Sequence, residues 1–249
     1  THGGVTITNA HPHFSSDKSF VIAQNGIVEN YTSLKSKLES KGFKFNTQVD
    51  TEAIVKLVEY ELKESNDIKK ALVTAFKQLE GRNTVILLDS RSKRILAIRN
   101  GSPLVMGINN ENIYLASDPL AFSQYTKEIV DIDNGELVEI QNGKWNIYSI
   151  KTGKEIIKVS RKEIFSNSDI DKGKYEHFML KEIVEQQHTI LTATGYTLKE
   201  LHPLIKQIKG SKTVYTIGAG KAGYSADQIA YYLRKISKIK AVSIKEYEI

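Results

Sequence analysis

The stretch QNGIVEN, residues 24–30, follows the apolar run at residues 21–23 and precedes a helical pattern. The apolar run predicts a buried strand, and Asn25-Gly26 predicts a sharp turn that ends it, because glycine accepts backbone angles that other residues avoid. Such a turn exposes a side-chain amide beside a backbone N–H, and two donors aimed at one point suit a developing oxyanion. Asn25 and Gly26 are therefore candidate oxyanion donors. An ordinary strand-to-helix turn would explain the same two residues without any catalytic role.

Length and composition bound the class of protein. With 249 residues the chain is long enough for one large domain or two ordinary ones. Its 40% hydrophobic content can fill a core, and no apolar run approaches the roughly 20 residues that span a bilayer. The chain has no cysteine, and its first residues do not resemble a signal peptide. We therefore expect a cytoplasmic protein without disulfides and without a membrane partner.

The net charge of +6 comes mostly from lysines spread over predicted helix faces. No stretch combines dense lysine and arginine with interleaved aromatic residues, so nucleic acid is not an expected partner. A solvated basic surface that favours anionic substrates is the preferred interpretation.

Three of the six histidines, His2, His11 and His13, fall within the first thirteen residues. Pro12 separates two of them, and no cysteine or neighbouring carboxylate completes a metal-binding shell. We therefore expect no metal here, and interpret these histidines as polar substrate contacts or loop hydrogen bonds.

Three helices are expected in the first third of the chain. Residues 32–41 and 67–79 carry apolar positions at helical spacing, and a further helix begins at Asp50 or Thr51, one of which is expected to cap it. A capping role for Asp50 is compatible with a binding role, because a carboxylate at a helix start can also face a ligand's ammonium group.

Seven strand-like runs separated by turn residues then fill residues 84–150. They are TVILLDS, KRILAIRN, PLVMGI, NIYLASD, KEIVDI, ELVEI and WNIYSI. Helices beside antiparallel strands predict an α+β domain with helices layered over sheet, and two packed sheets are an option.

The remainder of the chain has a different pattern. Residues 162–175 are polar and rich in turn residues, which predicts a linker. A helix with an apolar face follows, and a shorter one is expected at residues 198–208, where Pro203 is best tolerated in the first turn. The chain then gives a strand, a glycine-rich loop, a helix and a second strand. A single strand–helix–strand motif cannot cover both faces of its own sheet. We therefore expect either that the chain is a fragment or that a partner completes the sheet.

The loop GAGKAG, Gly218 to Gly223, matches the pattern G-x-G-x-x-G between a strand and a helix, with Glu246 after the second strand. Three interpretations stay open for it. The loop binds a nucleotide, it cradles a sugar phosphate with Lys221 adding charge, or its glycines only permit tight packing.

Several motifs taken in order resemble one family. The motifs THG, NAHPH, QNGIVENY, VDTEAI, SPLVMG and YLASD resemble the glutaminase domain of the glutamine–fructose-6-phosphate aminotransferases. The segment KGKYEHFMLKEIVEQ is similar to the one that joins this domain to the family's sugar isomerase half, and residues 213–233 resemble the start of that half.

The resemblance implies a four-layer αββα N-terminal nucleophile fold (a class II glutaminase domain) at residues 1–159. It implies a linker and connecting helix at 160–195, and the beginning of an α/β sugar isomerase (SIS) domain at 196–249. In the family, an N-terminal cysteine hydrolyses glutamine, and ammonia passes to fructose 6-phosphate to give glucosamine 6-phosphate. No cofactor is implied, and a homo-oligomer through the isomerase half is expected.

The same resemblance assigns roles to individual residues. Asn25 and Gly26 form the oxyanion hole. The glutamine pocket is formed by Gly26 with Thr1 and His2, and Asp50 holds the substrate's α-ammonium group. The sugar-phosphate loop comprises Gly220, Lys221 and Ala222.

The chain departs from the family in three respects. It has no cysteine, it lacks the arginine that precedes THG in relatives, and it has Lys221-Ala222 where relatives usually have Thr-Ser. We therefore expect a longer protein, with residues before Thr1 and after Ile249. Two other classes stay open: a non-catalytic sensor of a sugar phosphate or amino acid, and a nucleotide-binding enzyme that uses residues 218–223 and Glu246.

Overall fold

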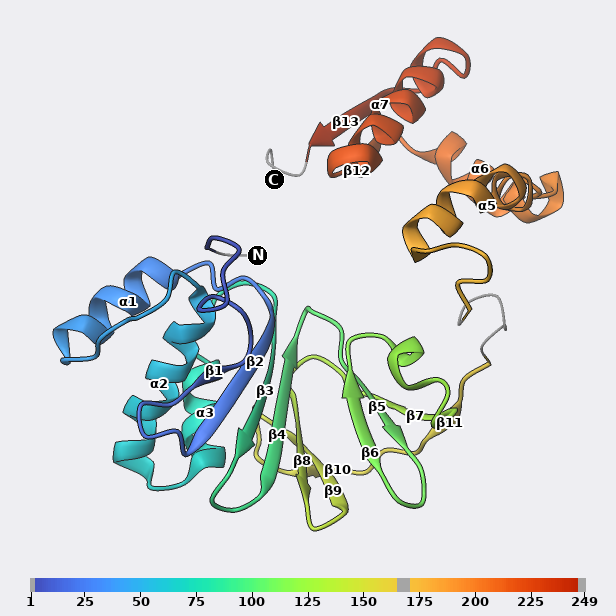
Figure 1. Ribbon diagram of the computed structural model, residues 1–249. Coiled ribbons are helices and arrows are strands. Elements are labelled where there is room, and N and C mark those ends of the chain that lie inside the picture. The colour runs from blue at the N-terminus through green and yellow to red at the C-terminus, as the bar shows by residue number, and fades with distance from the viewer. Residues whose placement is uncertain (1–2, 165–170, 246–249) are drawn as a thin grey trace. The chain divides into compact units, whose positions relative to one another are not determined.

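A computed structural model describes residues 3–164 and 171–245 of the chain, which divide into two compact units (Figure 1). The first unit spans residues 1–171 and the second spans residues 172–249. The division falls inside the segment 160–195, which we expected to be linker and connecting helix. Among the described residues, no helix is both long and apolar enough to span a bilayer.

The first unit contains two antiparallel sheets. The larger sheet has the order β1-β2-β3-β4-β8-β9-β10 and the smaller has the order β11-β7-β5-β6. The larger sheet is formed by β1 (His13–Phe14), β2 (Phe20–Gly26), β3 (Asn83–Asp89), β4 (Arg94–Asn100), β8 (Glu136–Gln141), β9 (Lys144–Ser149) and β10 (Glu155–Ile156). The smaller sheet is formed by β5 (Val105–Ile108), β6 (Ile113–Ala116), β7 (Glu128–Asp131) and β11 (Arg161–Lys162). The seven predicted runs correspond to β3 through β9 and are confirmed.

Three helices cover one face of the larger sheet (Figure 1). They are α1 (Tyr31–Ser40), α2 (Asp50–Ser65) and α3 (Ile68–Phe76). Side chains on β3 alternate between two cores, because successive residues of a strand point to opposite faces. Val85 and Leu87 pack beneath the helices, whereas Ile86 packs in a second core between the two sheets. Trp145 of β9 is half-buried against that second core.

The outer face of the smaller sheet is covered by the short 3-10 helix η1 (Pro119–Phe122). A Cβ atom at Gly107 of β5 would lie 2.5 Å from the Phe122 ring, so glycine is needed for this close approach. The described residues of the first unit therefore form three full layers, α1–α3 and two sheets. The fourth, helical layer implied by the family resemblance is represented in them only by η1.

The expected cap of α2 is wrong. Its N-cap is Val49, and neither Asp50 nor Thr51 occupies that position. Instead Glu52 reaches back from the first turn, where its carboxylate accepts hydrogen bonds from the backbone N–H groups of Asn46 (2.9 Å) and Thr47 (2.7 Å). Asp50 therefore does not act as the cap of α2.

The second unit contains three helices and one parallel pair of strands. They are α5 (Phe178–Ala193), α6 (Leu198–Gly210), β12 (Val214–Gly218), α7 (Gly220–Lys235) and β13 (Ala241–Lys245). The predicted order of strand, loop, helix and strand is confirmed. Pro203 lies inside α6 beyond its first turn, as the predicted range of residues 198–208 implied. The apolar face of α5 is largely exposed, with Ile183 54% and Leu191 71% accessible to solvent.

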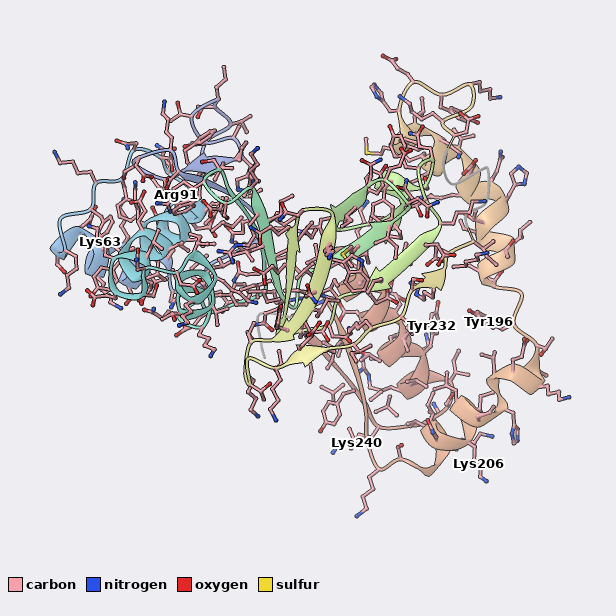
Figure 2. All side chains as sticks on the ribbon, turned by 90° about the horizontal axis from the view of Figure 1, so that it is seen from below. Lys63, Arg91, Tyr196, Lys206, Tyr232 and Lys240 are labelled. Atoms are coloured by element: carbon pink, nitrogen blue, oxygen red, sulfur yellow. The ribbon has the colours of Figure 1, made fainter. Side chains whose placement is uncertain are left out.

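Lysines are exposed on both units. Figure 2 shows Lys63 on the first unit, and Lys206 and Lys240 on the second, all of which are exposed. This placement agrees with the prediction that the net positive charge is spread over solvated surfaces.

Candidate functional site

The strand β2 runs through Asn25 and ends at Gly26, so the predicted break at Asn25 is wrong by two residues. Asn25 pairs with Thr84, and Gly26 pairs with Asn83 on the neighbouring strand. The φ angle of Gly26 is +145°, and a Cβ atom there would lie 2.0 Å from the carbonyl oxygen of Arg82. Only glycine permits this approach of two backbones, so the sequence requirement comes from packing as well as from the backbone angle.

Asn25 and Gly26 lie in the wall of a cavity of about 350 Å³. The cavity is lined by Asn9, Ala10, His11, Gln24, Asn25, Gly26, Val49, Asp50 and Thr51. Three of the predicted site residues, Asn25, Gly26 and Asp50, are therefore brought together. The other two residues of the predicted glutamine site, Thr1 and His2, lie outside the described residues.

Asp50 is a buried carboxylate, only 4% exposed, in the first turn of α2. Its Oδ2 accepts a hydrogen bond from the backbone N–H of Val28 at 2.7 Å, and lies 3.5 Å from Nε2 of Gln24. Asp50 thus offers the cavity a fixed negative charge that can hold a cationic group.

A chain of hydrogen bonds connects three residues of the cavity wall, His11, Thr51 and Gln24, to Asn83. Thr51 Oγ1 donates to Gln24 Oε1 at 2.6 Å and lies 2.7 Å from His11 Nε2. A hydroxyl has one hydrogen, so Thr51 accepts from His11, which assigns the His11 proton to Nε2. Gln24 Nε2 then donates to Asn83 Oδ1 at 2.7 Å, and Asn83 Nδ2 donates to the carbonyl oxygen of Ile27. The chain joins the start of α2 to the end of β2.

Two histidines meet at one end of this chain. The rings of His11 and His13 are perpendicular, with centroids 5.4 Å apart. Burial, followed by the neighbouring His11, lowers the pKa of His13 below its usual value. His13 is therefore neutral at pH 7. Among the residues that the structure describes, no three His, Cys, Asp or Glu side chains are grouped so as to hold a metal ion.

The segment after residue 2 is held to the same wall. Asn9 Nδ2 donates to the carbonyl oxygen of Gly4 at 2.9 Å, and the backbone N–H of Gln48 donates to Asn9 Oδ1 at 3.1 Å. The backbone N–H of Gly4 donates in turn to Gln48 Oε1 at 3.2 Å. Asn9 therefore ties the N-terminal segment to the residues that precede α2.

Sequence reasoning missed the roles of Gln24 and Asn83. A usable signal existed for Gln24, because the alternation of β2 places it on the same inward face as Phe20 and Ile22. A polar residue at an inward position needs a buried partner. The identity of that partner, 59 residues away, has no local signal.

The glycines of the loop 218–223 have different roles. A Cβ atom at Gly218 would lie 2.5 Å from the backbone of Ala222, and one at Gly223 would lie 3.0 Å from the carbonyl oxygen of Gly218. Tight packing of β12 against α7 therefore accounts for both. Gly220, with φ +51°, has open space around it and is exposed beside Lys221 and Ala222 at the start of α7. Glu246 lies outside the described residues.

Comparisons with known proteins agree with this architecture. A family model described as "Glutamine amidotransferase domain" matches residues 5–124. The glutamine–fructose-6-phosphate aminotransferase [isomerizing] of Methanocaldococcus jannaschii is 35% identical over 96% of this chain and 22% of its own length. The enzyme of that name from Escherichia coli (strain K12) is 36% identical over 93% of this chain and 39% of its own.

Two solved structures share the fold. One is described as the allosteric regulatory enzyme of purine biosynthesis, with a TM-score of 0.52 and 23% identity over 60% of this chain and 33% of that one. The other is the glutamine phosphoribosylpyrophosphate amidotransferase from B. subtilis, with a TM-score of 0.50 and 18% identity over 94% of this chain and 47% of that one. At these identities the likeness supports the fold alone.

Residues 5–124 of the first unit thus match a glutamine amidotransferase domain, and the two solved structures support its fold. Within that class, the resemblance to the glutamine–fructose-6-phosphate aminotransferases is confirmed along nearly the whole chain. The chain spans less than half the length of these relatives.

Proposed function

We propose that the first unit binds glutamine and hydrolyses its side-chain amide, and that the ammonia passes to fructose 6-phosphate to give glucosamine 6-phosphate. The observation that carries the glutamine part is a single cavity that holds Asp50 together with Asn25 and Gly26. The acceptor is proposed from the name of the relatives alone, because the chain spans less than half of their length.

Each group has a distinct role in this proposal. The buried carboxylate of Asp50 pairs with the α-ammonium group of glutamine. The side-chain amide of Asn25 and the backbone N–H of Gly26 donate to the oxygen of the substrate's amide as it gains negative charge. Donors that are already in place for this charge lower the barrier, because little reorganisation accompanies the reaction.

The nucleophile implied by the family resemblance is an N-terminal cysteine, and none of the 249 residues is cysteine. A second candidate function is a non-catalytic sensor of an amino acid or a sugar phosphate. The two candidates differ in one measurable respect. An amidotransferase releases ammonia from glutamine, whereas a sensor binds its ligand and leaves it intact.

For the second unit we propose a sugar-phosphate site at Gly220, Lys221 and Ala222, in a sugar isomerase domain that begins near residue 196. The support is the exposure of these residues at the first turn of α7, where backbone N–H groups and the lysine favour an anion. Calorimetry with fructose 6-phosphate and with NAD tests it. Saturable binding of NAD without a response to hexose phosphate would instead favour the nucleotide interpretation.

The glutamine proposal is tested with Asp50→Asn in the full-length protein, with ammonia release as the assay. The substitution removes the charge but keeps the size, so we expect KM for glutamine to rise at least tenfold. Asp67→Asn is the matched control, because Asp67 caps α3 through the N–H groups of Lys69 and Lys70 and lies outside the cavity. A cap is worth about 1 kcal/mol and asparagine replaces it well, so KM should not change in the control.

Three outcomes separate the candidates. Ammonia release with a raised KM in Asp50→Asn supports the amidotransferase. Glutamine binding without ammonia release in the full-length protein supports the sensor. An unchanged KM in Asp50→Asn removes this carboxylate from the substrate site.

A further inference from the structure

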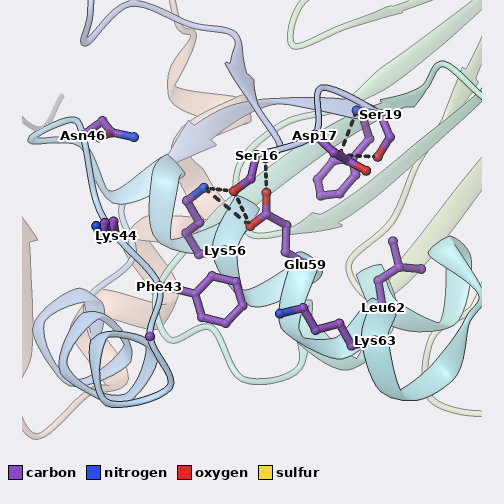
Figure 3. A pocket seen from close by; sticks show the side chains of 12 residues that line it. Ser16, Asp17, Ser19, Phe43, Lys44, Asn46, Lys56, Glu59, Leu62 and Lys63 are labelled. Carbon is purple, nitrogen blue, oxygen red and sulfur yellow. Dashed lines mark hydrogen bonds and ion pairs between the residues drawn. The ribbon is translucent and has the colours of Figure 1, made fainter.

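A second cavity, of about 630 Å³, lies in the first unit between the β1–β2 turn, α2 and the segment that joins α1 to α2 (Figure 3). It has no lining residue in common with the cavity that contains Asp50. Its volume falls in the range of about 300–1,000 Å³ that holds small molecules. The proposed glutamine reaction assigns it no task.

The two carboxylates in this wall already serve the β1–β2 turn. Asp17 Oδ1 accepts from Ser19 Oγ (2.7 Å), from the Ser19 N–H (3.0 Å) and from Ser15 Oγ (2.8 Å). These bonds lower the pKa of Asp17 to about 2, so it is ionised at neutral pH. Glu59 accepts from the backbone N–H and, at 3.1 Å, from the hydroxyl of Ser16. Both acids thus hold the turn through these hydrogen bonds, and the negative charge of Asp17 remains part of the cavity wall.

Three lysines outnumber these two acids. Lys56 is only 5% exposed, and its Nζ lies 2.9 Å from Ser16 Oγ and 3.5 Å from Glu59 Oε2. The positive charge of Lys56 and the negative charge of Glu59 therefore cancel. Lys44 and Lys63 are exposed at the cavity wall, and with Asp17 they leave the wall an excess of one positive charge.

The cavity also has a flat apolar surface. The ring of Phe43 meets that of Tyr60 edge to face, with centroids 6.4 Å apart and an interplanar angle of 74°, which fixes its orientation. The Nζ atom of Lys63 lies 4.9 Å from the centre of the Phe43 ring. Figure 3 shows Phe43 between the side chains of Lys56 and Lys63 in this view. Leu62 extends the apolar wall.

We propose that this cavity binds a small organic anion that carries a phosphate or carboxylate group on a flat apolar body. The anionic group lies at the wall that carries Lys44 and Lys63, and the apolar body packs on the ring of Phe43. An inorganic anion would leave the apolar wall unused, and a neutral apolar molecule would leave two ammonium groups unused. The site is separate from the proposed glutamine site and stands without it.

Titration calorimetry of the full-length protein tests this site with three probes. Phenyl phosphate has both parts of the proposed ligand, inorganic phosphate has only the charge, and benzyl alcohol has only the ring. We expect saturable binding of one phenyl phosphate per chain, at least tenfold tighter than either of the other probes. Saturating glutamine should leave this affinity unchanged, because the two cavities share no residue.

Substitutions in the cavity wall test whether phenyl phosphate binds in this cavity. Lys44→Gln and Lys63→Gln should each weaken phenyl phosphate binding about fivefold, and together about 25-fold, which is typical for two exposed ion pairs. Lys144→Gln, an exposed lysine on β9, is the matched control and should have no effect. Phe43→Leu keeps an apolar side chain, and should weaken phenyl phosphate binding while leaving the binding of inorganic phosphate unchanged.

Three results would overturn the proposal. The first is no saturable binding of phenyl phosphate to the native protein. The second is equal affinity for inorganic phosphate, which would remove the apolar half of the site. The third is binding that glutamine displaces, or that both lysine variants leave unchanged, because the ligand would then lie elsewhere.

Discussion

Replacement of Thr51 by valine tests the hydrogen-bond chain in the wall of the glutamine cavity. Valine keeps the branched shape of threonine, and Thr51 is 1% exposed, so the packing changes little. The hydroxyl, however, makes two short contacts, at 2.6 Å to Gln24 Oε1 and 2.7 Å to His11 Nε2. Removing it leaves the buried Gln24 oxygen without that donor.

The cost follows from the unmade hydrogen bond. A buried acceptor left unsatisfied costs about 1–3 kcal/mol, so we expect Thr51→Val to lower the free energy of unfolding by about 2 kcal/mol. For a unit of this size, that loss corresponds to a melting temperature lower by about 4–8 °C. Urea unfolding followed by circular dichroism measures the difference directly.

Thr51→Ser is the matched control for this prediction. Serine keeps the hydroxyl and loses one methyl group, so its cost is that of a buried methyl, about 0.8 kcal/mol. Thr51→Val should therefore be the less stable of the two. The reasoning is refuted if the valine variant unfolds within about 0.5 kcal/mol of the native protein, or if serine costs as much as valine.

Two further predictions concern the oxyanion donor and the acid sensitivity of the fold. Asn25→Ala in the full-length protein should lower kcat for ammonia release by about 10²–10³ with little change in KM, as is typical for the loss of one oxyanion donor; a near-normal kcat would remove Asn25 from the site. The pKa of Asp17 is lowered to about 2 from 3.8, so its hydrogen bonds stabilise the fold fully above about pH 4, and this contribution is lost as the pH falls toward 2. Asp17→Asn should flatten the pH dependence of urea unfolding in that window, and an unchanged slope would contradict the assignment.

The fold was predictable wherever local pattern decides it. Alternation identified β3 through β9, and apolar spacing located α1 within one residue of its observed ends. The cap of α2 was not predictable from Asp50 and Thr51, because the helix begins at Asp50 with Val49 as its N-cap and without a side-chain cap. The Asp50 carboxylate accepts from the backbone N–H of Val28 instead, a contact between segments that local propensity does not encode.

The sequence predicted individual residues of the candidate site but not the hydrogen bonds that join them. Asn25, Gly26 and Asp50 were identified from the motifs that contain them, and they do line one cavity. The contact between Gln24 and Asn83 spans 59 residues, and pairing in the sheet creates it. The second cavity was missed for the same reason, since Ser16, Phe43 and Glu59 meet only after the helices dock on the sheet.

The position of Trp145 has a practical consequence for spectroscopy. It is the only tryptophan in the sequence, and it packs against the core between the two sheets, opposite Ile140 in the β8–β9 pairing. Fluorescence excited at a wavelength that tyrosine does not absorb therefore comes from this chain's inter-sheet layer alone. A shift of the emission maximum signals that water has entered between the sheets, whereas loosening of α1–α3 on the opposite face leaves the emission unchanged.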